Sequence, residues 1–458
     1  MPANHQALTR LRLQRKLKVT DGTALIISNV IGVGIFTTPA VIAKLVPHPG
    51  AMLLLWVAGG LLSLAGAFTY AELARLCPEA GGEYNYLSHA FGPLAGFLSG
   101  WVSLIAGFSG AVAANAVALM GYLGPYLPKQ ISTSPLAIIP LGLARISISR
   151  QSLLASAIIL LFALIHLLGL GPGKLVQRAL AAFVLGAIAV FVVAGFYFGR
   201  GSWSHFHASG ATFRTRDWLL ALIPVMFTYS GWNAAAYVSE EMHDSERSVG
   251  TALALGTSIV VLVYLALNTL YVLAISMPEM GASINVAAVA MQRLVGAGGN
   301  YLVPVLVIAL LGAISAMTIA GPRVYFAMAR DGVFLPVFAR INPRFHTPDL
   351  AILLQAACSV GLVLLGSFEQ ILIYTGFAIT LSVGATATAL YVIRRRRKVH
   401  GPTLAMLAIP GTFAAVSFLM VANAIYNAPR LSLFGLALIA AGVPVFLFSR
   451  RRLARTSS

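Results

Sequence analysis

The chain has 458 residues, of which 59% are hydrophobic and only 10% are charged. Soluble globular proteins carry about 25% charged residues, so this composition excludes a soluble enzyme, a disordered chain and a DNA-binding domain as the main body. The net charge of +18 would suit nucleic acid, but the basic residues lie between and beyond long apolar runs, as they do in membrane proteins. The two cysteines, Cys77 and Cys358, argue against a disulfide framework and a cysteine-ligated metal.

Uncharged stretches of the chain predict twelve transmembrane helices. A bilayer core about 30 Å thick requires roughly 20 apolar helical residues for each crossing. Runs such as Leu153–Leu168 do not alternate between polar and apolar residues, which argues against the strands of an outer-membrane barrel. The stretches of sufficient length are 22–45, 51–75, 93–123, 152–171, 175–199, 217–241, 251–277, 300–329, 349–367, 370–393, 402–426 and 431–449.

The basic residues predict that both termini are cytoplasmic. Most of the 31 lysine and arginine residues, including the run Arg394–Lys398, fall on the side of the N-terminus, and loops rich in these residues face the cytoplasm. Residues 1–20 show no cleavable signal pattern, so the first span itself directs insertion. We therefore predict an integral protein of the cytoplasmic (inner) membrane with cytoplasmic tails at 1–20 and 451–458.

Two of the predicted helices, spans one and six, are interrupted near their middle by glycine and small polar residues. The interruptions lie in Asn29–Phe36 and in Phe227–Asn233. Interruptions at corresponding positions of two halves point to the binding site of a transporter. Because span one corresponds to span six, each repeat contains five helices. Five is an odd number, so the second repeat enters the membrane from the opposite side. We expect an all-α membrane protein with a LeuT-type 5+5 inverted repeat over 21–200 and 201–398, and helices 11 and 12 in 399–450.

An interrupted helix leaves main-chain N–H and C=O groups that lipid cannot satisfy. The N-terminus of a half-helix carries partial positive charge and suits a carboxylate, whereas free carbonyls and helix C-termini suit an ammonium group. A zwitterionic amino acid offers both groups. The alternative is that Gly32 and Gly34 only allow helices to pack closely, which a matching interruption in span six disfavours.

Four motifs occur in order between residues 20 and 400. They are Asn29–Phe36, Pro78–Tyr84, Phe227–Met242 and Tyr325–Gly332. With these motifs the chain resembles the amino acid–polyamine–organocation superfamily, and within it the L-type amino acid transporters and their bacterial relatives. The resemblance implies a secondary amino acid transporter that works by alternating access.

The resemblance also implies roles for single residues. Main-chain amides near the glycines of span one would receive the substrate carboxylate, and carbonyls of both interruptions would receive its amino group. Phe227 would close over the substrate on the outer side, and Asn233 would tie the broken helices together. The implied substrate-binding residues are Val30, Ile31, Gly32, Val33, Gly34, Phe227, Thr228, Ser230, Gly231, Trp232 and Asn233.

This chain departs from the family pattern at two places. Val33 stands where many relatives have serine between the two glycines. The stretch Ala179–Gly199 of span five lacks the lysine that stands in for a sodium ion in several relatives. Hydroxyls of Ser315 and Thr318 in span eight are a candidate ion site, and the alternative is that each hydroxyl bonds its own helix.

Other polar residues near the spans have less specific readings. Glu240 and Glu241 end span six, and together with Arg323 of span eight they are candidates for an inner gate. His166 in span four is read as a packing histidine in preference to a proton relay. No catalytic set or metal-ligand spacing is visible, so neither an enzyme nor a cofactor is expected.

The predicted function is transport of neutral L-amino acids, either by exchange or coupled to Na⁺ or H⁺. A basic substrate in a desolvated site would require a carboxylate partner, and the interiors of the predicted spans contain none. The expected partners are the amino acid and membrane lipid, without nucleic acid, and an accessory subunit is left open. The alternatives are an amino-acid-sensing membrane receptor without flux and a transporter of basic amino acids or polyamines.

Overall fold

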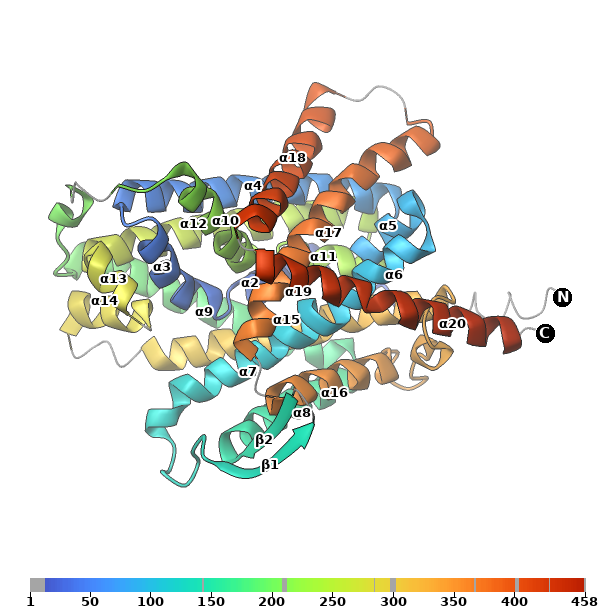
Figure 1. The fold of residues 1–458 in the computed structure, drawn as a ribbon, viewed down its shortest axis with the longest axis horizontal. Coiled ribbons are helices and arrows are strands. Elements are labelled where there is room, and N and C mark those ends of the chain that lie inside the picture. Colours follow the sequence, from blue (N-terminus) through green and yellow to red (C-terminus); the bar gives the residue numbers. More distant parts are fainter. Residues whose placement is uncertain are drawn as a thin grey trace.

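The computed structural model describes residues 13–141, 144–207, 212–283, 285–296, 302–365, 368–399, 403–427 and 429–456. These residues form a bundle of helices, and α4 (Pro49–Leu76) and α16 (Asp349–Leu365) run along its long axis in Figure 1. Residues 1–12 and 457–458, which belong to the two predicted cytoplasmic tails, lie outside the described residues.

The first part of the bundle extends to the end of the fifth predicted span. Its elements are α2 (Val19–Val30), α3 (Gly34–Leu45), α4, α5 (Glu83–Phe91), α6 (Pro93–Val102), the π-helical turn η1 (Ser103–Phe108), α7 (Ser109–Leu123), the short η2 (Gly124–Tyr126), β1 (Pro135–Leu141), β2 (Ala144–Ser149), α8 (Arg150–Leu167) and α9 (Leu170–Phe198).

The second part begins with a short helical turn and ends at the C-terminal helix. Its elements are η3 (Trp203–His207), α10 (Thr215–Tyr229), α11 (Ala234–Tyr237), η4 (Ser239–Glu241), α12 (Ser245–Ala274), α13 (Met277–Ala282), α14 (Val286–Val295), α15 (Leu302–Arg330), η6 (Pro336–Ala339), α16, α17 (Phe368–Arg396), α18 (Leu404–Asn427), α19 (Pro429–Ala440) and α20 (Gly442–Thr456).

The prediction of a polytopic membrane protein is confirmed. Among the described residues, nine helices are long and apolar enough to cross a membrane, and the bent pair α2–α3 brings the number to ten. The sixth predicted span is divided between α10 and α11, and the ninth corresponds to α16 with 17 residues. At 1.5 Å per residue, α16 is roughly 25 Å long, shorter than a bilayer core of about 30 Å. The count of twelve crossings stays a prediction.

The chain is helical as expected, and the described residues add one short hairpin that the sequence reasoning did not predict. β1 and β2 form an antiparallel hairpin between α7 and α8, with Ile138 opposite Ser147 and Ile139 opposite Ile146. The segment 146–149 alternates isoleucine and serine, the period that suits a strand with one covered face. The hairpin packs on α8 and α16 and lies at the lower edge of the view in Figure 1.

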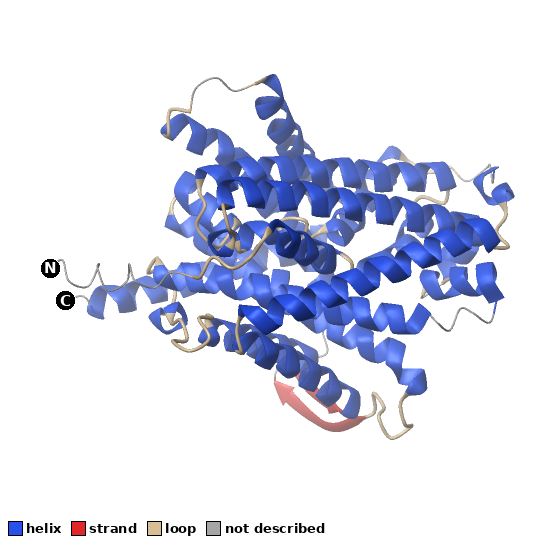
Figure 2. Cartoon of the chain, turned by 180° about the vertical axis from the view of Figure 1, so that it is seen from behind, coloured by secondary structure: helices blue, strands red, loops and turns tan. Residues whose placement is uncertain are grey.

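The two interrupted helices lie together in the middle of the bundle. Helix α3 packs against α10, and α2 packs against α11, so the first half of one interrupted helix faces the second half of the other. Around them α2 contacts α9, α12 and α15. Figure 2, seen from the opposite side, has helices covering this centre as well. This packing brings the two interruptions side by side, as an inverted pair of helices would.

Candidate functional site

The first interruption bends the chain by 44° between α2 and α3. The Gly32 amide donates to the Val30 carbonyl (2.9 Å), and the Val33 amide donates to Asn115 Oδ1 of α7 (3.3 Å). The amides of Gly32 and Val33, which were among those expected to receive a carboxylate, therefore have partners inside the protein. Helix α3 begins at Gly34. The Phe36 amide donates to the carbonyl of the N-cap residue Val33 (3.2 Å), and the amides at the very start of a helix have no carbonyl one turn earlier to bind. An anion is favoured at this end.

The second interruption depends on a glycine. Helix α10 ends at Tyr229, and Gly231 has φ +101°, a backbone conformation that side chains disfavour. A Cβ on Gly231 would lie 2.7 Å from the Asn29 amide nitrogen. Asn29 Nδ2 donates to the Gly231 carbonyl (3.3 Å), so Asn29 ties the two interruptions directly. The resemblance had given that role to Asn233.

Tyr264 of α12 contacts both interruptions of the candidate site, and the sequence reasoning missed it. Its hydroxyl lies 2.7 Å from the Val30 carbonyl and 3.2 Å from the Thr228 carbonyl, so it bridges the ends of α2 and α10. Both carbonyls were expected to receive the amino group of the substrate, and each retains a second lone pair. Thr228 also approaches Gly34, where an added Cβ would lie 3.0 Å from the threonine hydroxyl.

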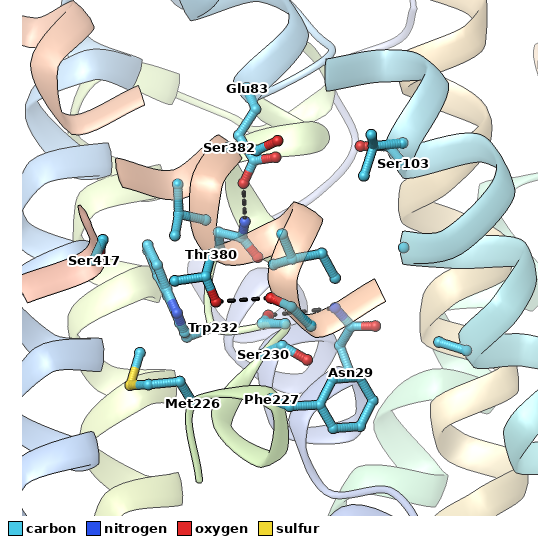
Figure 3. A pocket seen from close by; sticks show the side chains of 18 of the residues that line it. Asn29, Glu83, Ser103, Met226, Phe227, Ser230, Trp232, Thr380, Ser382 and Ser417 are labelled. Carbon is cyan, nitrogen blue, oxygen red and sulfur yellow. Dashed lines mark hydrogen bonds between the residues drawn. The ribbon is translucent and has the colours of Figure 1, made fainter. Parts of the chain in front are cut away.

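Two adjoining cavities run along the interruptions, and both are lined by Asn29, Ala111, Phe227, Ser230 and Met317. The first cavity is lined by Val30, Gly32, Val33, Gly34 and Thr228 among others. The second cavity, drawn in Figure 3, continues past Gly231, Trp232 and Asn233 to Glu83. Each implied substrate-binding residue thus lines one of the cavities, except Ile31, which is buried in the core.

Glu83 is the second residue that the sequence reasoning missed. Gly81 and Gly82 turn the chain with positive φ, and α5 then begins at Glu83, whose side chain is only 5% exposed. Its Oε1 accepts hydrogen bonds from the Tyr70 hydroxyl and from Asn233 Nδ2, both at 2.8 Å. The expectation that no carboxylate serves this site is therefore wrong, because the loop after α4 folds back into the bundle.

Two ion pairs connect α15 with the end of the second interrupted helix. Arg323 donates to both oxygens of Glu241, with Nε–Oε2 2.8 Å and Nη2–Oε1 3.0 Å, and both side chains are buried. Arg330 pairs with Glu240 at 2.8 Å. The N-terminal segment joins them, since the Leu17 amide donates to the Glu241 carbonyl (2.9 Å). Of the three residues predicted for the inner gate, Glu241 and Arg323 therefore pair with each other, and Glu240 pairs with Arg330.

The hydroxyls of the candidate ion site have partners in the protein. Thr318 Oγ1 donates to the Ile314 carbonyl of its own helix (2.7 Å). Ser315 Oγ lies 3.0 Å from Nε2 of His166, which is buried on α8. The Thr318 geometry matches the alternative of a hydroxyl bonded to its own helix, and His166 packs with a polar partner.

The fold and the cavities define a class of protein. A polytopic bundle with two interrupted helices facing one another across a central cavity is the architecture of a membrane transporter. The chain matches the model of the amino acid permease family over residues 17–448. It belongs to this family, which confirms the resemblance inferred from the four motifs.

Several relatives are similar to the chain over most of its length. The cystine/glutamate transporter of Homo sapiens is 27% identical over 445 residues, covering 95% of this chain and 85% of the relative. The b(0,+)-type amino acid transporter 1 of Homo sapiens is 27% identical over 422 residues (91% and 84%). The Asc-type amino acid transporter 1 of Mus musculus is 27% identical over 451 residues (96% and 82%).

Proposed function

We propose that this protein moves neutral L-amino acids across the cytoplasmic membrane by alternating access, with both termini in the cytoplasm. The observation that carries the proposal is the meeting of two helix interruptions at one cavity. Helix α3 begins there at Gly34, and α2 and α10 end there at Val30 and Tyr229. A partial positive end and two partial negative ends at one cavity suit the carboxylate and ammonium groups of one zwitterion.

The lining of the cavities supports a neutral side chain. Beside the interruptions lie Phe227, Trp232, Met226 and Met317, which offer apolar surface to a substrate that leaves water. The relatives named above are transporters of amino acids by their names. Basic amino acids remain a second candidate, and Glu83 is the observation that favours them, because a buried carboxylate can pair with a cationic side chain.

The ion pairs of α15 suit the inner gate. In a state closed to the cytoplasm, Glu241–Arg323 and Glu240–Arg330 would hold the end of the second interrupted helix against α15. Opening would then require these pairs to separate or to move together with one of the helices. The proposal includes no sodium site, because Ser315 and Thr318 already have protein partners.

Counterflow into liposomes tests this function. Purified protein would be reconstituted into vesicles preloaded with unlabelled leucine, alanine, serine, lysine or arginine, and labelled amino acid would be added outside. We expect accumulation with the neutral amino acids and little with lysine or arginine. Accumulation with lysine or arginine alone would replace the neutral substrate by a basic one. Binding of amino acids without counterflow for any of them would indicate a receptor.

A further inference from the structure

Glu83 differs from the other buried carboxylates in what surrounds it. Within the described parts of the chain the remaining three are Asp21, Glu241 and Asp349, which lie 2.5, 2.8 and 3.5 Å from a nitrogen of Arg178, Arg323 and Arg340, respectively. Glu83 has no ion-pair partner among the described residues. An ionised carboxylate that is buried without a countercharge is costly, so this group requires a proton or a visiting cation.

Neutral groups face Glu83 from the elements around it. These are Tyr70 of α4, Tyr86 of α5, Asn233 of the second interruption and Tyr237 of α11. Helix α6, which packs on α5, carries no ionisable residue.

The arginines of α15 and those near the end of α17 are bound to groups other than Glu83. Arg323 and Arg330 of α15 bind Glu241 and Glu240. Arg394, the arginine of α17 that binds a carboxylate, pairs with Glu72 at 3.0 Å. Arg396 and Arg397 donate to the main-chain carbonyls of His89 and Leu76, so no described arginine forms an ion pair with Glu83.

Burial also disfavours the ionised form of Glu83. In the sequence, Glu83 lies between the candidate membrane spans Pro49–Leu76 and Pro93–Leu123, and its side chain is buried in the fold. Desolvation raises the pKa of its carboxyl above the ordinary value, and hydrogen bonds from Tyr70, Tyr237 and Asn233 offset part of the increase. A raised pKa means that the carboxyl takes up its proton at a higher pH than an exposed glutamate does.

The position of Glu83 links its charge to the substrate cavity. Asn233, which donates to Glu83 Oε1, is two residues from Gly231, and Gly231 accepts from Asn29 of the first interrupted helix. An ionised carboxylate accepts charge-assisted hydrogen bonds from Tyr70 and Asn233 at Oε1, whereas the neutral acid accepts weaker ones. Protonation thus weakens the link between α5 and the second interruption, which lines both cavities.

We propose that Glu83 is the proton-binding site through which this protein couples amino acid transport to a proton gradient. The proposal rests on transport of a neutral amino acid as the function. The carboxylate takes a proton from water on the side to which the cavity is open, carries it through the conformational change and releases it on the other side as the carboxylate forms again. One proton then accompanies each amino acid, and no covalent bond of the substrate changes.

The test compares Glu83→Gln with the unaltered protein in liposomes. Labelled alanine uptake would be measured with an acidic outside and with equal pH, and a pH-sensitive dye inside the vesicles would report proton entry. For the unaltered protein we expect several-fold higher uptake with the gradient, and acidification upon addition of alanine. For Glu83→Gln the uptake ratio should fall to about one, without acidification. Glu279→Gln, a carboxylate on α13 paired with Arg293, should keep the ratio of the unaltered protein.

A second variant keeps the proposal testable where Glu83→Gln fails to fold. Tyr70→Phe removes one donor to the ionised form of Glu83, which favours the protonated form. The pH midpoint of gradient-free uptake should therefore move upward by about one unit. An unchanged midpoint in folded Tyr70→Phe would contradict the assignment.

Other outcomes separate the two proposals. Proton entry that persists in Glu83→Gln, or uptake by the unaltered protein that ignores the gradient, would overturn the proton site while leaving transport intact. A change of selectivity in Glu83→Gln from lysine to alanine would assign the carboxylate to a cationic substrate instead. Absence of counterflow for every neutral amino acid would refute the transport function itself.

Discussion

Two buried glutamates, Glu83 and Glu241, lie near the two ends of α11, and their side chains have different kinds of partners. Glu241 forms two hydrogen bonds with Arg323, a planar donor that matches a carboxylate. Glu83 accepts from the neutral groups of Tyr70 and Asn233. The guanidinium of Arg323 supplies Glu241 with a countercharge and holds its side chain in place, whereas the described partners of Glu83 are neutral. Within one short region the protein therefore has one carboxylate suited to hold a gate and another suited to titrate.

The largest effect is expected from breaking the paired glutamate. Arg323→Met leaves the Glu241 charge buried without a partner, which costs about 3–5 kcal/mol. Thermal denaturation in detergent should show a large loss of stability, and Glu241→Met added to it should restore part of the loss. The control is Arg293→Met in the exposed pair with Glu279, where less than about 1 kcal/mol is expected. Equal losses in the two single variants would contradict this comparison.

The second prediction concerns the backbone turn at Gly231, two residues before Asn233. Gly231→Ala introduces a side chain at φ +101° and within 2.7 Å of Asn29, and strain of this kind costs about 1–3 kcal/mol. Alanine uptake should fall roughly tenfold or more, since 1.4 kcal/mol corresponds to a factor of ten. Gly186→Ala on α9, where an added Cβ meets open space, is the matched control. Normal uptake by Gly231→Ala would show that the interruption tolerates a side chain.

A smaller effect is expected at the hydroxyl that bridges the interruptions. Tyr264→Phe removes the contacts with the Val30 and Thr228 carbonyls, and a hydrogen bond of this type contributes about 1 kcal/mol. The apparent affinity for alanine in uptake should weaken about fivefold. Tyr271→Phe on the same helix is the control, since the Tyr271 hydroxyl has no hydrogen-bond partner in the described part of the chain. A similar response of both variants would remove Tyr264 from the site.

The smallest effect is expected at the candidate ion site. Thr318→Val removes a hydroxyl that bonds the Ile314 carbonyl of its own helix. Uptake measured with sodium and with choline in the buffer should keep the same ratio as in the unaltered protein. A specific loss of sodium stimulation would instead restore the ion site that the sequence suggested.

Much of the site was accessible from the sequence because it consists of main-chain features. Gly32, Gly34 and Gly231 mark the interruptions in the residue pattern itself, and the cavities lie at these places. The side chains that bind the freed main-chain groups could not be predicted from the sequence. Asn115 and Tyr264 come from α7 and α12, and their contact with the interruptions depends on how distant helices pack.

Glu83 illustrates a different failure of the sequence reasoning. Its motif was noticed, but its position after span two indicated a loop outside the membrane helices. The two glycines before it were the available signal, because positive φ at Gly81 and Gly82 allows the chain to turn back into the bundle. The hairpin formed by β1 and β2 was missed because a short alternating segment beside long apolar helices gives a weak pattern.

The sequence by itself determined that this protein lies in a membrane and that two of its helices are interrupted. Those properties follow from apolar runs and from glycines, which act within a single turn or span. Only the tertiary structure decided which carboxylate meets an arginine and which does not, as Glu241 and Glu83 demonstrate. Electrostatic partners are set by distances between elements remote in the chain, and a charge acquires its chemical role only when those distances are fixed.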